Sequence, residues 1–91
     1  MGVIEKSLGS PETVSKEENL HNLILFNDEV NSFDYVIDSL IAVCGHDFLQ
    51  AENCALIAHY KGKCVIKNGS LDALKPMKRE LDFRDLTVEI N

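Results

Sequence analysis

The sequence changes character within the stretch Leu23-Ile24-Leu25-Phe26-Asn27-Asp28-Glu29-Val30-Asn31-Ser32-Phe33. Its first four residues are apolar, which is typical of a short strand that lies in the middle of a small sheet. An amide and two carboxylates follow at once, and a helix-capping residue comes within a few positions. A strand, an acidic loop and a helix start in this order predict a site of ligand recognition at the loop. We call its residues Asn27-Asp28-Glu29 the acidic corner.

Chain length and charge limit the fold and the classes of partner. The 91 residues suffice for one domain, and 45% of them are hydrophobic. We expect a core domain at 20–91 and a mobile tail at 1–19, which is rich in Gly, Pro, Ser and Glu. The formal net charge of -6 argues against nucleic acid or an anionic membrane as a partner, because both require clustered Lys and Arg.

The charge is also unevenly distributed along the chain. Residues 20–60 contain no Lys or Arg, whereas Lys61 begins a basic second half. The acidic half could attract a cationic group while the basic half docks a second partner.

Local signals predict three strands and three helices in the order β-α-α-β-α-β. Apolar runs and alternation indicate strands at 20–26, 64–66 and 86–90. Helical periods fill the intervals between these strands. The expected architecture is a three-stranded sheet with its helices on one face.

The predicted helices have start and stop signals. Asn31, Asp47 and Ser70 are the predicted N-caps, because their short polar side chains can accept hydrogen bonds from free helix amides. Gly45 and Gly62 are the predicted left-handed ends of the first two helices. These two helices should therefore form a tight hairpin joined by two or three residues.

Helical spacing also predicts which faces are buried. The first helix repeats apolar residues at Phe33, Val36, Ile37, Leu40, Ile41 and Cys44. The second presents a small-residue face at Ala51, Cys54, Ala55 and Ala58. Pro76 lies inside the third helix, where it removes an amide donor, so we predict a kink or a separate first turn there.

Neither a cofactor nor a metal ion is expected. The cysteines Cys44, Cys54 and Cys64 form no Cys-x-x-Cys pair, and no zinc-ligand spacing is present. Their apolar neighbours indicate buried reduced thiols in a cytoplasmic protein. No apolar run approaches the ~18 residues of a membrane span, and the N-terminus lacks the apolar core of a signal peptide.

His59 closes the second predicted helix and is suited to hydrogen bonding with a ligand. Its ring can accept from an ammonium group or donate to a carbonyl. A single helical histidine is more often a surface or packing residue, and Asn27-Asp28-Glu29 alone is more often a solvated turn. The combination of the two signals is more informative than either.

The acidic corner and the helix hairpin ending in His59-Tyr60-Lys61-Gly62-Lys63 closely resemble the ClpS family of Clp protease adaptors. The resemblance extends from about Leu20 to Ile90. It implies an α+β fold, a three-stranded antiparallel sheet packed on three helices, which is related to the C-terminal domain of the ribosomal stalk protein. It also implies binding of N-degron proteins, which begin with Phe, Tyr, Trp or Leu, and their delivery to a Clp AAA+ ATPase of the ClpA or ClpC type.

The resemblance implies roles for individual residues. The α-amino group of the substrate would be bound by Asn27, Asp28, Glu29 and His59, with Glu29 in the place of a usual second Asp. The hydrophobic pocket would be lined by Phe33, Val30, Asn31, Ala55 and Ala58. The candidates for docking the ATPase are Lys61, Lys63 and Lys67, and the 1–19 tail would modulate the same partner.

Two other classes of function fit parts of the sequence. A ribosomal-stalk-like module that binds translation factors would use a helix surface and would be indifferent to peptide N-termini. An enzyme could use Asp28, Glu29 and His59 as an acid-base set, but no nucleophile, metal ligands or phosphate loop accompanies them. We therefore expect a binding protein with no catalytic residues.

Overall fold

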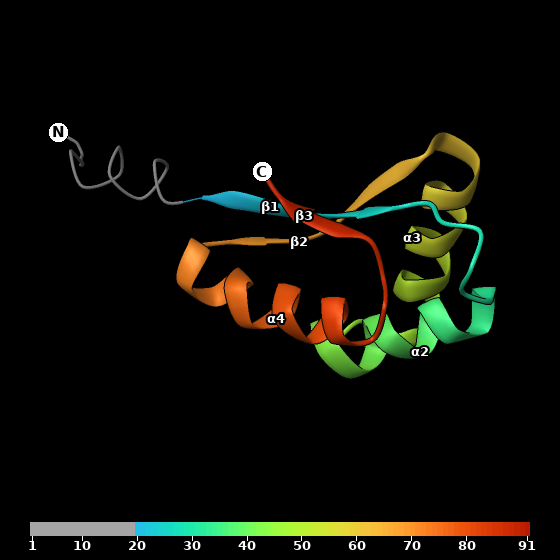
Figure 1. The fold of residues 1–91 in the computed structure, drawn as a ribbon, viewed down its shortest axis with the longest axis horizontal. Coiled ribbons are helices and arrows are strands. Elements are labelled where there is room, and N and C mark those ends of the chain that lie inside the picture. The colour runs from blue at the N-terminus through green and yellow to red at the C-terminus, as the bar shows by residue number, and fades with distance from the viewer. Residues whose placement is uncertain (1–19) are drawn as a thin grey trace, which may run out of the picture.

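The computed structural model describes residues 20–91, so the prediction of a mobile tail at 1–19 lies outside the described residues. In chain order, the described elements are β1 (His21–Phe26), α2 (Phe33–Cys44), α3 (Phe48–Lys61), β2 (Lys63–Gly69), α4 (Leu71–Phe83) and β3 (Val88–Ile90) (Figure 1). This arrangement confirms the predicted order β-α-α-β-α-β.

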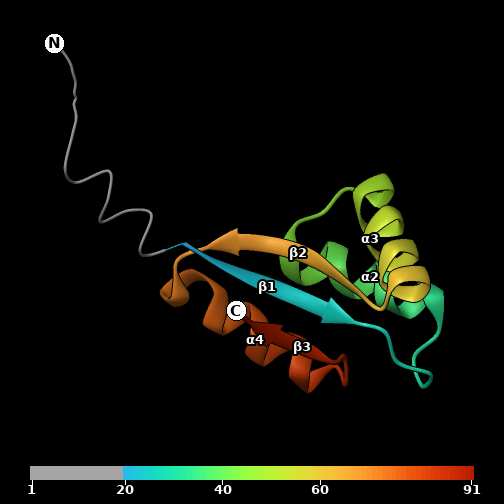
Figure 2. The same ribbon diagram turned by 90° about the horizontal axis from the view of Figure 1, so that it is seen from above.

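The strands of residues 20–91 form one antiparallel sheet in the order β2-β1-β3 (Figure 2). In the central strand, Leu25 pairs with Cys64 of β2 on one side and with Val88 of β3 on the other. Leu23, Ile24 and Leu25 are all buried, as predicted for a strand in the middle of a sheet. The helices α2 and α4 lie on one side of the sheet, and α3 lies beside the start of β2 (Figure 1).

The N-cap of α2 is Ser32, whose Oγ accepts a hydrogen bond from the Tyr35 amide at 3.1 Å. The prediction of Asn31 as the cap is therefore wrong. The Asn31 side-chain amide instead donates to the Asp28 carboxylate and to the Asp85 carbonyl oxygen. This leaves the next hydroxyl in the chain to satisfy the helix amides.

The signals at the other helix ends are confirmed. Asp47 caps α3 and Ser70 caps α4, each accepting from the amide three residues on. Gly45 ends α2 with a φ of 73°, and Gly62 ends α3 with a φ of 95°. Both angles lie in the left-handed region that glycine adopts without steric cost.

The predicted apolar stripe of α2 is narrower in the structure. Ile37, Leu40 and Cys44 are buried, whereas Phe33 and Ile41 are 38% and 37% exposed. The small-residue face of α3 is confirmed at its three alanines, which are all buried: Ala51, Ala55 and Ala58. Small side chains on α3 let α2 and β2 approach it closely.

The strand β2 is longer than the predicted 64–66 and contains a β-bulge. Leu23 pairs with Lys67 and Ile24 with Val65, so Ile66 is the extra residue. The Ile66 carbonyl oxygen accepts a hydrogen bond from Nε2 of the buried His46 at 2.7 Å. This bond attaches the link between α2 and α3 to the sheet.

The helix α4 continues through Pro76 as one element, so its first turn is not a separate segment. β3 begins at Val88 and is shorter than the predicted 86–90. The Leu86 amide donates to the Leu81 carbonyl oxygen at 3.0 Å. Leu86 therefore belongs to the end of α4 rather than to the sheet.

Among residues 20–91, no helix combines the length and the hydrophobicity needed to cross a membrane. Within the same part of the chain, no group of three or more His, Cys, Asp or Glu is placed to bind a metal ion. Cys44, Cys54 and Cys64 are free thiols, and Cys44 alone among them is fully buried.

Candidate functional site

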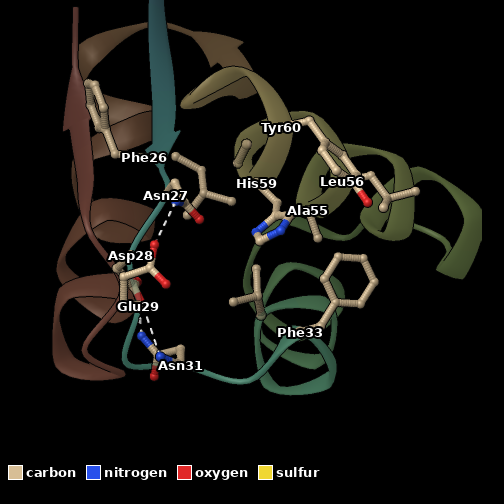
Figure 3. A pocket seen from close by; sticks show the side chains of 13 residues that line it. Phe26, Asn27, Asp28, Glu29, Asn31, Phe33, Ala55, Leu56, His59 and Tyr60 are labelled. Carbon is tan, nitrogen blue, oxygen red and sulfur yellow. Dashed lines mark hydrogen bonds between the residues drawn. The ribbon is translucent and has the colours of Figure 1, made fainter.

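A cavity of about 410 Å³ lies where β1 ends, α2 begins and α3 ends (Figure 3). Its polar wall consists of Asn27, Asp28, Glu29, Asn31 and His59. Its apolar wall consists of Leu25, Phe26, Phe33, Val36, Ala55, Leu56, Ala58 and Tyr60. The volume is within the roughly 300–1,000 Å³ that is typical of sites for small ligands.

The two walls meet because the end of β1 is attached to the end of α3. The Asn27 amide donates to the Gly62 carbonyl oxygen at 2.9 Å. The Gly62 amide in turn donates to the Ala58 carbonyl oxygen and closes the helix. His59 lies in this last turn of α3, and its ring faces the Asn27 side of the cavity (Figure 3).

Asp28 organises the loop between β1 and α2. Its Oδ1 accepts hydrogen bonds from the Val30 and Asn31 amides, each at 2.9 Å, and its Oδ2 accepts from the Asn31 Nδ2 at 3.1 Å. Burial alone would raise the pKa of Asp28, but these hydrogen bonds outweigh burial and hold the pKa below its ordinary value. Three acceptor sites of the carboxylate are occupied, so about one lone pair, on Oδ2, is left for a ligand.

Asn27 and Glu29 are the more accessible acceptors of the corner. Asn27 Nδ2 donates to Glu29 Oε2 at 3.4 Å, which is a long hydrogen bond. Since the Asn27 amide nitrogen is used in this way, its Oδ1 is the atom left to accept from a ligand. Both residues are exposed at the cavity rim.

The His59 ring contacts the ring of its chain neighbour Tyr60. The two ring centroids are 4.9 Å apart and the planes meet at 78°, an edge-to-face contact. Tyr60 is 77% exposed, so this contact lies at the surface. His59 is exposed, so one edge of its ring remains available to a molecule in the cavity.

The apolar wall combines a fixed base with accessible side chains. Ala55 and Ala58 are only 4% and 3% exposed, because they pack into the core. Leu56 and Phe33 are 37% and 38% exposed beside them. These two side chains supply apolar surface that a bound group could cover.

Most residues predicted for the site line this one cavity. They are Asn27, Asp28, Glu29, Asn31, Phe33, Ala55, Ala58 and His59. Val30, which was predicted to line the pocket, does not: its amide is bonded to Asp28 and its side chain is 87% exposed. The prediction that Val30 lines the pocket is therefore corrected.

The sequence reasoning missed five lining residues: Leu25, Phe26, Val36, Leu56 and Tyr60. Helical spacing could have found two of them. Leu56 lies one turn before His59 on α3, and Val36 lies one turn after Phe33 on α2, so each shares a helix face with a predicted residue.

The three lysines predicted to dock a partner differ in their surroundings. Lys67 Nζ donates to the Cys44 carbonyl oxygen at 3.3 Å, so it is bound to the end of α2. Lys61 and Lys63 are exposed on either side of Gly62. Of the predicted docking residues, these two have their ammonium groups more accessible to a partner.

The cavity provides hydrogen-bond acceptors and an anionic charge at one side and apolar surface at the other. The arrangement is therefore suited to binding a group with a cationic end and an apolar end.

The family model described as "ATP-dependent Clp protease adaptor protein ClpS" matches residues 16–86 of this chain. Among solved structures, the chain is similar to Agrobacterium tumefaciens ClpS2 bound to L-phenylalaninamide, with 20% sequence identity and a TM-score of 0.75. The similarity covers 80% of this chain and 95% of the Agrobacterium chain. The two proteins therefore share the same α+β fold.

Proposed function

Because this chain belongs to the ClpS family of ATP-dependent Clp protease adaptor proteins, we propose that it binds the N-terminal residue of substrate proteins and delivers them to a Clp AAA+ ATPase. The observation that carries the proposal is the meeting of the polar wall and the apolar wall in one cavity. The first residue of a protein that begins with Phe, Tyr, Trp or Leu combines a cationic amine with an apolar side chain, which fits both walls.

The polar wall binds the α-amino group. A free α-amino group has a reference pKa of about 7.7–8.0, so it is mostly cationic at neutral pH. Asn27 Oδ1, the Glu29 carboxylate and His59 accept hydrogen bonds from it, while Asp28 offers its remaining lone pair and holds the loop. Each hydrogen bond that involves a charged group contributes about 1.5–3 kcal/mol.

The same wall excludes internal peptide segments. A peptide nitrogen within a chain carries one hydrogen and no positive charge, so it cannot satisfy several acceptors at once. An unpaired acceptor that is covered by the ligand costs about 1–3 kcal/mol. The cavity thus distinguishes the beginning of a polypeptide from its interior.

The apolar wall binds the side chain of the first residue. Burial of an aromatic or Leu side chain contributes about 1.5–3 kcal/mol. Micromolar affinity needs about 8 kcal/mol, so the amine and the side chain must bind together. The Agrobacterium relative was solved with L-phenylalaninamide, a ligand that carries both a free amine and an aromatic ring.

The ATPase docks on the basic half of the chain. Lys61 and Lys63 are exposed next to the cavity, and an acidic surface of the partner would complement them. Lys67, the third candidate for docking, is also exposed, and its Nζ donates to the Cys44 carbonyl oxygen. The protein acts as an adaptor and carries no catalytic chemistry of its own.

The test of the proposed function is a titration of the full chain with a peptide that begins with Phe and with its N-acetylated twin. Acetylation removes the charge and two amine hydrogens but keeps the side chain. We expect acetylation to weaken binding by more than about tenfold, which corresponds to the loss of one charged hydrogen bond. Equal affinity for the two peptides would overturn the proposal.

A further inference from the structure

The turn between α4 and β3 has a fixed backbone geometry. Asp85 has a φ of 69° in the left-handed region, and its amide donates to the Asp82 carbonyl oxygen at 2.9 Å. The Leu86 amide donates to the Leu81 carbonyl oxygen at 3.0 Å. These two bonds form a Schellman motif, and both leucines are buried, as the motif's hydrophobic contact requires. The Asp85 carbonyl oxygen is therefore a rigidly held acceptor.

Asn31 connects this turn to the polar wall of the cavity. Its Nδ2 donates to the Asp85 carbonyl oxygen at 2.8 Å and to Asp28 Oδ2 at 3.1 Å. Its backbone amide donates to Asp28 Oδ1 at 2.9 Å. Both oxygens of the Asp28 carboxylate are thus bound by one residue, which is itself attached to a part of the chain 54 positions away.

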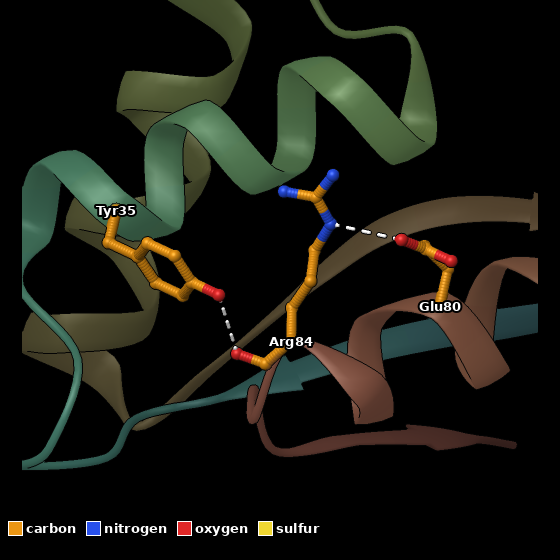
Figure 4. Close-up of polar contacts among 3 residues, drawn as sticks. All are labelled: Tyr35, Glu80 and Arg84. Atoms are coloured by element: carbon orange, nitrogen blue, oxygen red, sulfur yellow. Dashed lines mark hydrogen bonds and ion pairs between the residues drawn. The ribbon is translucent and has the colours of Figure 1, made fainter.

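A second contact attaches α2 to the same turn. The Tyr35 hydroxyl donates to the Arg84 carbonyl oxygen at 2.9 Å (Figure 4). The Arg84 side chain is held by an ion pair between its Nε and Glu80 Oε2 at 3.3 Å (Figure 4). The loop between β1 and α2 is therefore fixed near both of its ends, by the Asn27 bond to Gly62 and by the α4–β3 turn.

We propose that Asn31 is a positioning residue for amine recognition, which holds the Asp28 carboxylate against the Asp85 turn and thereby keeps the Asn27 and Glu29 acceptors in place. The inference rests on the proposed function and deepens it. Asn31 acts through Asp28 rather than through contact with the substrate side chain.

The physical effect is preorganisation of the loop. Without the Asn31 amide, Asp28 keeps its two backbone hydrogen bonds but loses its connection to the Asp85 turn. The loop would then have to be ordered when the peptide binds, which reduces affinity. A residue that merely lined an apolar pocket would behave in the opposite way, since an apolar replacement would preserve or increase affinity.

The experiment compares Asn31→Leu, Asn31→Ser and wild type in titrations of the full chain with a Phe-initiated peptide. Leu has a similar size but no donor, and Ser can donate only one hydrogen bond. We expect Asn31→Leu to weaken binding by about threefold to tenfold and Asn31→Ser to give an intermediate loss. Asn53→Leu, the same exchange at an exposed α3 position outside the cavity, should keep the wild-type affinity.

Nuclear magnetic resonance titration of Asp28 provides a second readout that does not depend on the peptide. Removal of the Asn31 side-chain donor should raise the pKa of Asp28 toward its ordinary value, because a hydrogen bond to the charged form is lost. Circular dichroism would verify that each variant is folded. If Asn31→Leu did not fold, Asn31→Ser would carry both measurements.

The outcomes separate this inference from the proposed function. Suppose that the wild-type protein distinguishes the free amine from the acetylated peptide, but that Asn31→Leu has the wild-type affinity and an unchanged pKa of Asp28. This result would overturn the positioning role alone. A wild-type protein that binds both peptides equally would overturn the proposed function and the positioning role with it.

Discussion

The two walls of the cavity are held in place in different ways. Apart from His59 on α3, the polar wall lies on the loop after β1, and Asp28 fixes this loop through three hydrogen bonds to Val30 and Asn31. Apart from Leu25 and Phe26 of β1, the apolar wall lies on α2 and α3, where Ala55 and Ala58 are buried in the core and set the position of the helix. One wall therefore depends on local polar geometry and the other on helix packing.

This difference predicts different responses to substitution. Loss of one partner in the loop changes the position of several acceptors, because the same carboxylate holds more than one backbone group. Loss of an outer side chain on α3 removes its own contact area and leaves the helix in place. Amine recognition and side-chain recognition should therefore be separable by mutation.

The largest effect is expected from Asp28→Ala, which removes the three hydrogen bonds that the Asp28 carboxylate accepts. The variant loses one negative charge, and the Asn27 and Glu29 acceptors are no longer held in position. We expect the affinity for a Phe-initiated peptide to fall by more than about tenfold, measured by isothermal titration calorimetry.

Asp38→Ala is the matched control for that substitution. Asp38 is exposed on α2 and does not line the cavity, so its replacement removes the same charge elsewhere. A loss of affinity in Asp38→Ala as large as that in Asp28→Ala would mean that net charge, rather than loop geometry, determines amine binding.

A smaller effect is expected at the apolar wall from Leu56→Ala. Leu56 is 37% exposed and lines the cavity, so its truncation removes surface that the substrate side chain would cover. The expected loss is about 1 kcal/mol, or about fivefold in affinity for a Phe-initiated peptide. The ratio between the free-amine peptide and its acetylated twin should stay the same.

Ile57→Ala provides the comparison on the same helix. Ile57 is 41% exposed, so its side chain is about as accessible as that of Leu56, but it does not line the cavity. Equal losses in the two variants would contradict the assignment of Leu56 to the binding surface.

The resemblance of the sequence to the ClpS family is confirmed by the match over residues 16–86. The order of the elements, the central position of β1 and the stops at Gly45 and Gly62 could be predicted because each depends on local patterns. Buried strands and left-handed glycine ends leave strong signals in a single sequence.

Features that depend on distant contacts could not be predicted in the same way. The sequence predicts Asn31 as the cap of α2, but Ser32 is the cap, and the Asn31 side chain instead donates to the Asp85 carbonyl oxygen, which is far along the chain. The bond between Lys67 and the Cys44 carbonyl oxygen likewise joins two elements and leaves no local signal in the sequence. Both features depend on tertiary hydrogen bonds.

The smallest expected effect is a change in the free energy of unfolding with pH. It tests whether Asp28 acts mainly through its charge or mainly by fixing the geometry of the polar wall. Hydrogen bonds outweigh burial and lower the pKa of Asp28 in the folded protein. A carboxylate with a lowered folded-state pKa stabilises the fold above its unfolded pKa, and this contribution is lost as pH falls through the folded pKa. The difference in free energy of unfolding between wild type and Asp28→Asn should therefore stay constant from about pH 7 to 5 and shrink below about pH 4.

Urea unfolding of both proteins at each pH would measure this difference. Asp28 is only half-buried, so solvent and salt screen its charge and the change should be small. A difference that did not shrink at low pH would contradict a stabilising role for the ionised carboxylate. A small change in stability together with a large loss of binding in Asp28→Ala would mean that Asp28 acts chiefly by fixing where the acceptors lie.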